Sequence, residues 1–480
     1  MYFVTHRAIH RRLPTPFVVA KRELHEHVFC QRMSRFFQPI HAAKQPSVKD
    51  GDGVSKGFEL LSTAGYIRQS SGGVFHILPL CQRVLDKLTR VVRQQMASVD
   101  ACQLTLPTLV RDTLWKQTGR MDKMGGELMT VEDRAGHGFV LSPTHEEAVT
   151  ALVGSVSPIS GRQLPLRLYQ ITAKFRDEMR PRFGLLRCKE FLMKDLYTFD
   201  SSEAAAMDTY RAVGRAYSGL FKRLGVPVVR VRGDSGVMGG GVSHEYHVLA
   251  PVGEDRLLVR PDCRQDECPA AVNLEVVRPE RETAPGEAGM DTCQACGHPL
   301  QERTGIEVGH TFVLGQLYSE TLGAFTVTDS DGRVPLHMGC YGIGLTRLLA
   351  AVVESRAQPG QPISWPAALA PFTLCVITPK AGSREEAART WALQMLSQLS
   401  QLPELRDDLL WDDRDHLTIG QRVRESRRSG HRAVLVFGRA AAEGGSGPGR
   451  PRAELITADG SQLLTESELP DRLAQLCREQ

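Results

Sequence analysis

The sequence predicts a protein of mixed α/β (α+β) class that is divided into two folded domains. Its 480 residues and 41% hydrophobic composition can build more than one core. Helix-like and strand-like patterns are mixed until the Pro-rich, aperiodic stretch 356–370, and regular strand–helix alternation follows over residues 371–480. We therefore expect a large domain over residues 50–355, a linker, and a smaller α/β domain at the C-terminus.

The first 35 residues have the composition of a mitochondrial presequence. They include Arg7, Arg11 and Arg12, their first acidic residue is Glu23, and they lack the apolar core of a secretory signal. Processing is expected near Arg35, followed by residence in the mitochondrial matrix; the alternative interpretation is an ordinary basic tail. Removing seven Lys/Arg and two Glu lowers the net charge from +4 to about −1, so a polyanion must be bound by local basic patches.

The remaining composition narrows the class of protein. Mean hydropathy is −0.23 and no apolar window has the length of a membrane span, so we expect no membrane contact. The 11 cysteines are mostly isolated, which favours a reducing compartment over a disulfide framework.

Two helices of the large domain are marked by their spacing and caps. Residues 80–96 place apolar side chains at helical spacing, and Pro79 suits the first position of that helix. The segment GFVLSPTHEEAVTALV predicts a strand that leads into a helix. Thr144 is the candidate N-cap of this second helix, and Glu147 would complete a capping box.

A third helix and a run of strands follow in the large domain. Asp200 with Glu203 indicates the start of this helix, and Gly225 its end. Residues 226–259 favour strands, with Gly253–Glu254–Asp255 as a hairpin turn.

The C-terminal domain alternates strands and helices, which is typical of a small layer of parallel strands. One helix is expected from Ser383, with Glu386 completing a capping box, and a second from Ile419 to Ser429. The strands are expected over residues 372–378, 409–413 and 431–438.

The stretch FRDEMRPRFGLLRCKEFLMKD at residues 175–195 combines charged and apolar residues. If FRDE begins a strand, Arg176 and Glu178 project from one face and can address one ligand. Arg offers a planar fork of donors to a phosphate or carboxylate, while Glu accepts from an exocyclic amine. Arg187 and Phe191 would return on a neighbouring strand, where an aromatic ring can stack on a purine. The alternative interpretation is a charged hairpin on a solvated face.

The segment MGCYGIGLTRLLAAVVE combines glycines with an arginine at the head of an apolar helix. Gly339, Gly342 and Gly344 allow close backbone approach to a ligand, and Arg347 follows them. Spacing and context do not fit a dinucleotide-binding fingerprint, and the GxxxxGK[ST] pattern of a P-loop is absent from the sequence.

In combination, these segments resemble the class II aminoacyl-tRNA synthetases. Residues 65–90, which include Pro79, resemble motif 1 of that class, residues 172–200 its motif 2, and residues 337–352 its motif 3. PTHEEAVTAL, the FRDE stretch, SHEY, EVGHTFVLG and GCYGIGLTRLLAA together resemble prolyl-tRNA synthetases of the bacterial and mitochondrial type. The resemblance runs in chain order from residue 55 to the C-terminus. It implies a catalytic domain with an antiparallel, six-stranded-type sheet, followed by an anticodon-binding domain.

The resemblance also implies a role for each matching residue. Arg176 would hold the α-phosphate of ATP and the amino-acid carboxylate, and Arg347 would hold the γ-phosphate. Thr144 and Glu146 would receive the proline nitrogen, which as a secondary ammonium offers two N–H donors. Simpler roles stay open for two residues: Thr144 as an N-cap only, and His310 as a satisfied core histidine. The remaining assignments are Glu178, Arg187, Phe191, Glu307 and His310 to ATP, Phe312 and Gly339 to proline, and Arg180 and Arg182 to phosphates of ATP or the tRNA end.

The implied reaction has two steps. Proline attacks the α-phosphate of ATP to give prolyl-adenylate and pyrophosphate, and the prolyl group then passes to the terminal ribose of tRNA(Pro). Arg176, Arg347 and Mg²⁺ would act by positioning and charge stabilisation. Because Mg²⁺ prefers water and phosphate oxygens, no protein cage for it is expected. The resemblance further implies a homodimer, with Pro79 at its interface.

Two alternatives stay open at this point. One is another class II synthetase, such as a threonyl or seryl enzyme. The other is a catalytically inactive synthetase-like protein that binds nucleic acid, although such a protein need not keep both Arg176 and Arg347.

The interval between motifs 2 and 3 differs from that of many bacterial relatives, which carry a large editing insertion there. No such domain fits here, so proofreading by this chain is not expected. The interval contains two cysteine pairs, of which the second has the CxxC spacing of a zinc half-site and the first is CxxxxC. We expect a metal-free relic of a ribbon rather than a zinc site. The cysteines are Cys263, Cys268, Cys293 and Cys296.

Basic residues of the C-terminal domain gather in QRVRESRRSGHR. Arg424, Arg427 and Arg428 share one helix face, and Arg422 is near them. In an anticodon-binding domain these four arginines predict contact with tRNA, in which phosphates give salt-dependent affinity and splayed bases give specificity. The alternative interpretation is a solvated helix face.

Overall fold

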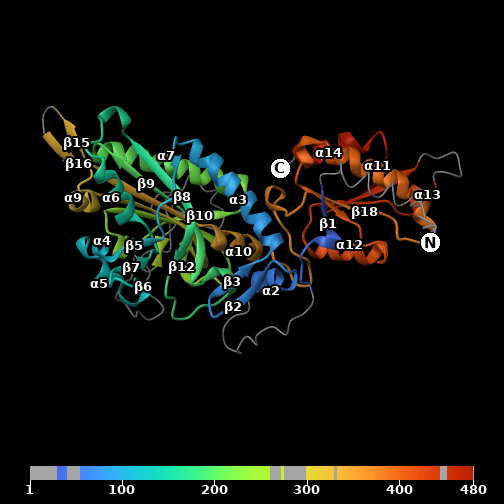
Figure 1. The fold of residues 1–480 in the computed structure, drawn as a ribbon, viewed down its shortest axis with the longest axis horizontal. Helices are drawn as coiled ribbons and strands as arrows, with labels where there is room; N and C mark the ends of the chain where they lie inside the picture. The colour runs from blue at the N-terminus through green and yellow to red at the C-terminus, as the bar shows by residue number, and fades with distance from the viewer. Residues whose placement is uncertain are drawn as a thin grey trace, which may run out of the picture. The chain divides into compact units, whose positions relative to one another are not determined.

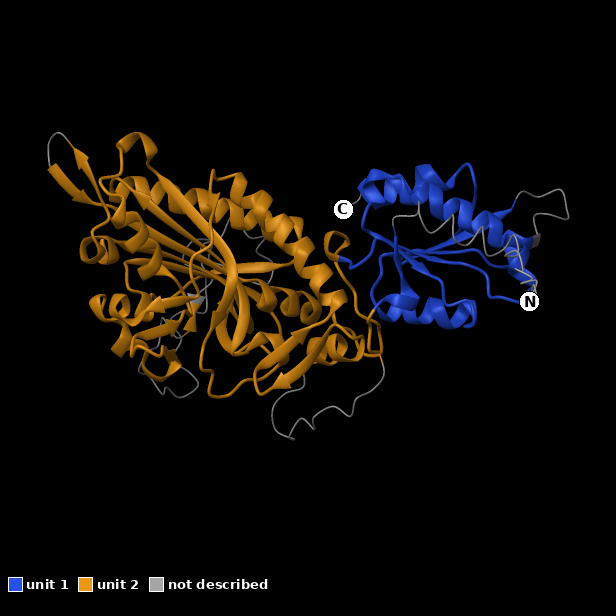
Figure 2. Ribbon diagram, in the orientation of Figure 1, with its two compact units in different colours: residues 1–36, 370–480 blue, residues 37–369 orange. Residues whose placement is uncertain are grey.

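The computed structural model describes residues 30–40, 55–259, 272–274, 299–328, 332–443 and 451–478. The chain divides into two compact units, which Figure 2 shows in different colours. One unit spans residues 37–369, and the other combines residues up to 36 with residues 370–480. Within the described ranges, no helix is both long and apolar enough to cross a membrane.

A mainly antiparallel sheet forms the centre of the larger unit (Figure 1). Each of its four middle strands runs antiparallel to the next. In spatial order they are β14 (Gln301–Gly315), β17 (His337–Gly344), β9 (Glu190–Asp200) and β8 (Leu166–Phe175). Beyond them lie β4 (Cys102–Gln103) at one edge, and β10 (Val228–Arg232), β11 (Val242–Leu249), β12 (Asp255–Val259) and β13 (Val272–Asn273) at the other. The antiparallel sheet predicted for this domain is confirmed.

The two faces of this sheet are covered differently. On one face, the long helix α7 (Glu203–Arg223) contacts β9, β14 and β17, and α3 (Pro79–Ala97) contacts both α7 and α10 (Leu345–Arg356). Tyr341 of β17 lies on the α7 side, where its ring centre is 5.9 Å from that of Tyr210. Because side chains alternate along a strand, Cys340 and Gly342 face the opposite side. The short helices α6 (Glu146–Ser155) and α9 (Leu317–Leu322) contact each other, and Val149 and Tyr318 share an apolar cluster with Cys340.

The other described helices and strands of the larger unit are short. They are α2 (Lys56–Thr63), the hairpin β2 (Ile67–Ser71) and β3 (Val74–Ile77), the sheet of β5 (Leu109–Arg111), β7 (Gly138–Leu141) and β6 (Met129–Glu132), the helices α4 (Asp112–Gln117) and α5 (Arg120–Met124), and the hairpin β15 (Phe325–Thr328) and β16 (Gly332–Pro335).

Helix starts agree with the sequence-based expectation at α3 but not at α6 or α7. Pro79 occupies the first turn of α3, as predicted. Thr144 does not cap α6, because the N-cap position is one residue later and the Thr144 hydroxyl hydrogen-bonds to the carboxylate of Glu146. Helix α7 is capped by Ser202 rather than Asp200, whose carboxylate accepts from the Thr209 hydroxyl instead.

The predicted hairpin at Gly253–Glu254–Asp255 is wrong. Strands β11 and β12 are both antiparallel to β14, and Leu249 and Asp255 both lie opposite Gly305. The chain therefore leaves the edge of β14 briefly and rejoins it in the same direction. A side chain at Gly253 would lie 2.4 Å from the backbone of Gly305, so only glycine fits this close approach.

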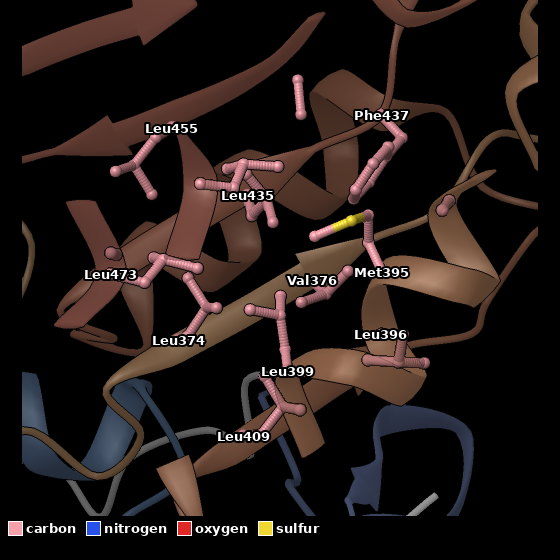
Figure 3. Packing of buried hydrophobic residues seen from close by; sticks show 14 of the residues in the cluster. Leu374, Val376, Met395, Leu396, Leu399, Leu409, Leu435, Phe437, Leu455 and Leu473 are labelled. Atoms are coloured by element: carbon pink, nitrogen blue, oxygen red, sulfur yellow. The ribbon is translucent and has the colours of Figure 1, made fainter. Parts of the chain in front are cut away.

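The smaller unit has a six-stranded sheet of order β1-β19-β18-β20-β21-β22, in which β1 is Gln31–Arg32. The three middle strands β19 (Leu409–Asp412), β18 (Leu374–Ile377) and β20 (Ala433–Val436) are parallel, as predicted. Figure 3 shows Leu374 and Leu435 of these strands packed with Met395 and Leu399. The other elements are β21 (Arg452–Thr457), β22 (Gly460–Thr465), α11 (Arg389–Ser400), α12 (Ile419–Arg428), α13 (Arg439–Glu443) and α14 (Leu469–Arg478).

The start of α11 departs from the expected capping box. A 3₁₀ turn over residues 384–388 precedes the α-helix, and Ser383 makes no capping hydrogen bond. The Glu386 carboxylate instead accepts from the backbone N–H of Gly382, at 3.0 Å.

The last residues of the predicted presequence contact the smaller unit. Residues Gln31–Arg32 form β1, which pairs in parallel with β19. Both the backbone N–H and the hydroxyl of Ser34 donate to the Asp413 carboxylate, at 2.8 and 2.6 Å. The Phe36 ring packs edge-on against Phe372. Residues 31–36 thus belong to the folded smaller unit, which extends further toward the N-terminus than the composition indicated.

Candidate active site

A cavity of about 310 Å³ lies on the sheet face opposite α7. A Cβ at Gly342 would have nothing closer than 3.9 Å, so the glycine leaves open space above the strand. A second hollow, of about 400 Å³, shares Arg176, Glu307 and Arg347 with the first. The floor of the cavity comes from alternate residues of β9, β17 and β14, namely Phe191, Met193, Cys340, Gly342, His310 and Phe312.

Arg176 lies where the two hollows meet. FRDE does not begin a strand, because β8 ends at Phe175, but the backbone N–H of Arg176 still donates to Lys189, at 2.9 Å. The guanidinium carbon lies 5.4 Å from the centre of the Phe191 ring. Burial, together with the charge of Arg347, lowers the pKa of Arg176. Its buried Nε has no hydrogen-bond partner among the described residues, which fits a site for an anionic group.

Charged residues of the second hollow form a network of ion pairs. Arg187 Nε lies 2.8 Å from the Glu178 carboxylate, and its Nη1 lies 2.5 Å from Glu254. Arg182 Nε also lies 2.5 Å from Glu254. The burial of Glu178 opposes its ionisation, but the hydrogen bonds from Arg187 and the Arg180 backbone, together with the charges of Arg187 and Arg176, outweigh burial and lower the Glu178 pKa. Arg182 and Arg187 thus contact a carboxylate, Glu254, to which the sequence assigned no functional role, while Arg180 is exposed.

A chain of hydrogen bonds links Arg347 to the cavity wall. Arg347 Nε donates to the Leu186 carbonyl at 2.9 Å, and its Nη1 donates to the Glu307 carbonyl at 3.1 Å. The Glu307 carboxylate lies 2.9 Å from His310 Nδ1, and His310 Nε2 lies 2.5 Å from the Ser243 hydroxyl. Burial would raise the Glu307 pKa, but this bond with His310 and the nearby positive charges hold it well below its usual range. His310 is therefore more than an isolated core histidine.

Thr144 and Glu146 form a buried acid–hydroxyl pair at one wall of the cavity. The Thr144 hydroxyl lies 2.7 and 2.8 Å from the two Glu146 oxygens and 3.2 Å from the hydroxyl of Tyr197. Tyr197 donates to Asp195 at 2.9 Å, and the Cys340 thiol lies 3.0 Å from Glu146. The pair can accept hydrogen bonds from a cationic amine, because the hydroxyl has lone pairs to offer and the carboxylate carries the opposite charge.

The structure places Phe312 and Gly339, the two residues predicted to contact proline, on opposite faces of the sheet. Phe312 lines the cavity, and its ring is stacked on His310 with centroids 3.9 Å apart. Gly339 does not line it, because it lies on the other face of β17, where a Cβ would be 2.4 Å from the Tyr341 hydroxyl. Its assignment to proline is therefore corrected, and Cys340 and Gly342 are the residues of this strand that line the cavity.

Several residues at the site escaped the sequence-based interpretation. Arg120 lines the cavity, and its Nη1 lies 3.0 Å from both Glu146 and Glu147. Glu147 had been read as half of a capping box. Ser243 lies in SHEY and Cys340 in the glycine-rich segment, both without an assigned role. One sequence signal could have indicated these residues. They are polar and lie within apolar strands and helices, where a buried polar group needs a hydrogen-bond partner.

The arginines of α12 fall into two groups. Arg424, Arg427 and Arg428 are exposed, as a tRNA-binding face requires. Arg422 is 0% exposed and donates to the backbone carbonyls of Asp412 and Thr378, at 3.1 and 2.7 Å. The prediction that Arg422 binds tRNA is therefore wrong, because its guanidinium is taken up by the fold. The candidate zinc ligands Cys263, Cys268, Cys293 and Cys296 lie outside the described residues.

Comparison with known proteins agrees with this arrangement. Residues 129–356 match the family model of the tRNA synthetase class II core domain (G, H, P, S and T). A rat protein named "Probable proline--tRNA ligase, mitochondrial" is 42% identical over 416 residues, covering 86% of this chain and 84% of its own. The proline--tRNA ligase of Agrobacterium fabrum is 39% identical over 397 residues, with 80% and 87% coverage.

The solved structures that match show the same fold at low sequence identity. A Giardia lamblia prolyl-tRNA synthetase, solved in complex with prolyl-adenylate, aligns with a TM-score of 0.66 and 16% identity over 88% of this chain and 80% of its own. A Cryptosporidium parvum enzyme, complexed with halofuginone and AMPPNP, aligns with the same TM-score and 14% identity over 92% and 80%. The fold and the site thus define a class II aminoacyl-tRNA synthetase. Within that class, the chain belongs to the proline--tRNA ligase family.

Proposed function

We propose that this chain activates L-proline with ATP to form prolyl-adenylate and transfers the prolyl group to tRNA(Pro) for translation in the mitochondrial matrix. The observation that carries the proposal is a single cavity with two complementary ends. At one end the Thr144 hydroxyl lines the cavity, with the Glu146 carboxylate bonded behind it, and these can accept from a cationic amine. At the other end Arg176 offers donors for a carboxylate or phosphate. The mitochondrial location is supported by the names of the rat and human relatives.

Proline would bind as a zwitterion across the cavity. Its ammonium would donate one N–H to the Glu146 carboxylate and the other to the Thr144 hydroxyl, and its carboxylate would accept from Arg176. The stacked rings of His310 and Phe312 would contact the apolar pyrrolidine. Each end of the substrate then meets the opposite charge, and the carboxylate oxygen that attacks phosphorus is fixed in direction.

ATP would occupy the space shared by the two hollows. Arg176 and Arg347 would hold its α- and γ-phosphates, Phe191 would stack on adenine, and Glu178 would accept from the exocyclic amine, fixed in place by Arg187. Mg²⁺, when bound with ATP, would neutralise charge on the phosphates. The reacting carboxylate is already ionised, so the first step needs no protein base. Its acceleration would come from fixed positive charge and from positioning.

The rest of the proposal concerns assembly and selectivity. Exposed Arg424, Arg427 and Arg428 would contact tRNA in the smaller unit. We infer a homodimer whose interface includes motif 1, here the β2–β3 hairpin and α3 with Pro79 in its first turn. We also infer that no separate editing domain separates motifs 2 and 3 in this chain.

The test is aminoacylation by the purified protein and by Arg176→Ala. Wild type should form prolyl-adenylate and charge tRNA(Pro). The variant should lose adenylate formation by a factor of about 10³ or more, because a charged donor to the transition state is removed. Arg162→Ala, an exposed arginine outside the cavity, is the matched control and should retain activity. If wild type bound tRNA but formed no adenylate, the chain would be the inactive, nucleic-acid-binding alternative.

A further inference from the structure

Three buried charged residues form a cluster at the wall of the cavity. Arg120, Glu146 and Glu147 are 2%, 0% and 0% exposed. Arg120 Nη1 lies 3.0 Å from Glu146 Oε2, 3.0 Å from Glu147 Oε1 and 3.2 Å from Glu147 Oε2. One guanidinium nitrogen is thus shared by two carboxylates.

The guanidinium of Arg120 is fixed from several sides. It lies 4.8 Å from the centre of the Trp115 ring and 5.6 Å from that of Tyr318. Among the described residues, the hydrogen-bond partners of its Nη2 are the sulfurs of Met124 and Met238, at 3.9 and 3.1 Å. Because sulfur is a weak acceptor, the strong interactions of the cation are those with the two carboxylates. These contacts hold the Arg120 guanidinium in one position, where it interacts with both carboxylates.

Four titratable groups packed around the cluster are neutral at pH 7, and the Lys174–Asp195 ion pair and the Arg176 guanidinium are also near it. Burial raises the pKa of Tyr197 of β9, Tyr318 of α9 and Cys340 of β17 well above their usual ranges. Burial, with the charge of Lys174, lowers the pKa of His145 to about 4. With both carboxylates ionised, the cluster carries two negative charges and one positive charge.

The two carboxylates face different surroundings. Glu146 contacts the Thr144 hydroxyl and the Cys340 thiol, both of which line the cavity. Neither carboxylate is itself among the residues that line the cavity, and besides Arg120 the Glu147 carboxylate contacts the hydroxyl of Thr118, at 3.1 Å, which does not line it either. Glu147 therefore acts on a ligand only through the shared guanidinium.

We propose that Arg120 and Glu147 are positioning residues that give the cavity wall one uncompensated negative charge, which selects the cationic amine of the substrate. Because Glu147 offsets the positive charge of Arg120, the negative charge of Glu146 is available to attract the ammonium. Without Glu147, Arg120 and Glu146 would form a neutral pair. This inference rests on the proposed function, since it assigns the substrate amine to Glu146.

The proton affinity of Glu147 supports this account. Burial raises the Glu147 pKa to about 7, with Arg120 opposing and Glu146 adding to the rise. In the empty site a proton therefore partly offsets the surplus charge. A bound ammonium replaces that proton, so substrate binding at pH 7 should release a fraction of a proton to the buffer.

The first experiment compares Glu147→Gln with wild type in proline-dependent ATP–pyrophosphate exchange. The amine stays cationic through adenylate formation, so the variant loses binding equally in the ground and transition states. The KM for proline should rise by roughly ten- to a hundredfold, with kcat and the KM for ATP nearly unchanged. Asp200→Asn is the matched control, because it also removes a buried carboxylate, one that accepts from Thr209 of α7 on the sheet face opposite the cavity.

The second experiment needs no variant and uses the competitive ligand tetrahydrofuran-2-carboxylate, which replaces the ring ammonium by a neutral oxygen. Calorimetry at pH 7 in two buffers of different ionisation enthalpy should show proton release with proline but none with this analogue. Glu147→Gln should weaken proline much more than the analogue.

The outcomes separate the inference from the proposed function. No exchange with proline in wild type would overturn the proposed function itself. If wild type shows normal exchange, either of two results would overturn the role of Glu147 alone. One is an unchanged KM for proline in Glu147→Gln, and the other is no proton release when proline binds to wild type. A fall in kcat equal to the rise in KM would assign Glu147 to structure rather than to charge.

Discussion

At the residue scale, the sequence predicted which residue types meet but not how their charges are shared. Arg176, Glu307 and Arg347 do line both hollows, and His310 lines the first; their chemistry suits phosphate and carboxylate groups. The role that we propose for Glu147 could not be predicted, because a capping box explains a Glu at that position equally well. Only the tertiary fold brings Arg120 beside it, from a separate short helix.

His145, which precedes Glu146, gives a pH-dependent prediction. Burial, followed by the charge of Lys174, lowers its pKa from 6.5 to about 4. The unfolded chain therefore binds the proton more tightly, and the stability that His145 contributes is lost as pH falls from 6.5 toward 4. A shift of this size corresponds to about 3 kcal/mol.

The variant His145→Asn keeps a good N-cap residue for α6 but does not titrate. Urea unfolding of both proteins at pH 7, 5.5 and 4 should show that wild type loses more stability on acidification than the variant does. A difference between the two proteins that stays constant over this range would contradict the assignment.

At the scale of elements, the regular alternation of the smaller domain was predictable and the irregular ends were not. The parallel strands β18, β19 and β20 follow from apolar runs separated by helical segments. The short strand β1 was not predicted, because two residues carry no periodicity. The α6 cap failed for a different reason, since the Thr144 hydroxyl has a stronger local acceptor in Glu146.

Helix α12 gives the element-scale prediction. Arg427→Ala should weaken tRNA(Pro) binding and reduce the slope of log K against log salt by about one, because it removes one phosphate contact. Arg422→Met should leave the slope unchanged and lower stability by about 1–3 kcal/mol, because buried carbonyls lose their donor. Filter binding from 50 to 300 mM salt (~sixfold range) measures the slope. Equal salt slopes for wild type and Arg427→Ala would remove this arginine from the interface.

At the scale of the whole molecule, the order of motifs along the chain predicted the family and the antiparallel sheet, and both are confirmed. Composition alone predicted the N-terminal boundary less well. Basic residues mark a presequence, but composition does not reveal that residues 31–36 bond to β19, Asp413 and Phe372 far along the chain. Contacts between residues so far apart in the chain cannot be predicted from local sequence patterns.

The central claim is that this cavity selects and activates proline. It is tested most directly by ATP–pyrophosphate exchange with the purified protein against a panel of amino acids that includes proline, alanine, threonine and serine. We expect strong exchange with proline and much weaker exchange with the others, because only proline combines the secondary ammonium with a ring that fits against His310 and Phe312. Exchange with threonine or serine but not with proline would contradict the account.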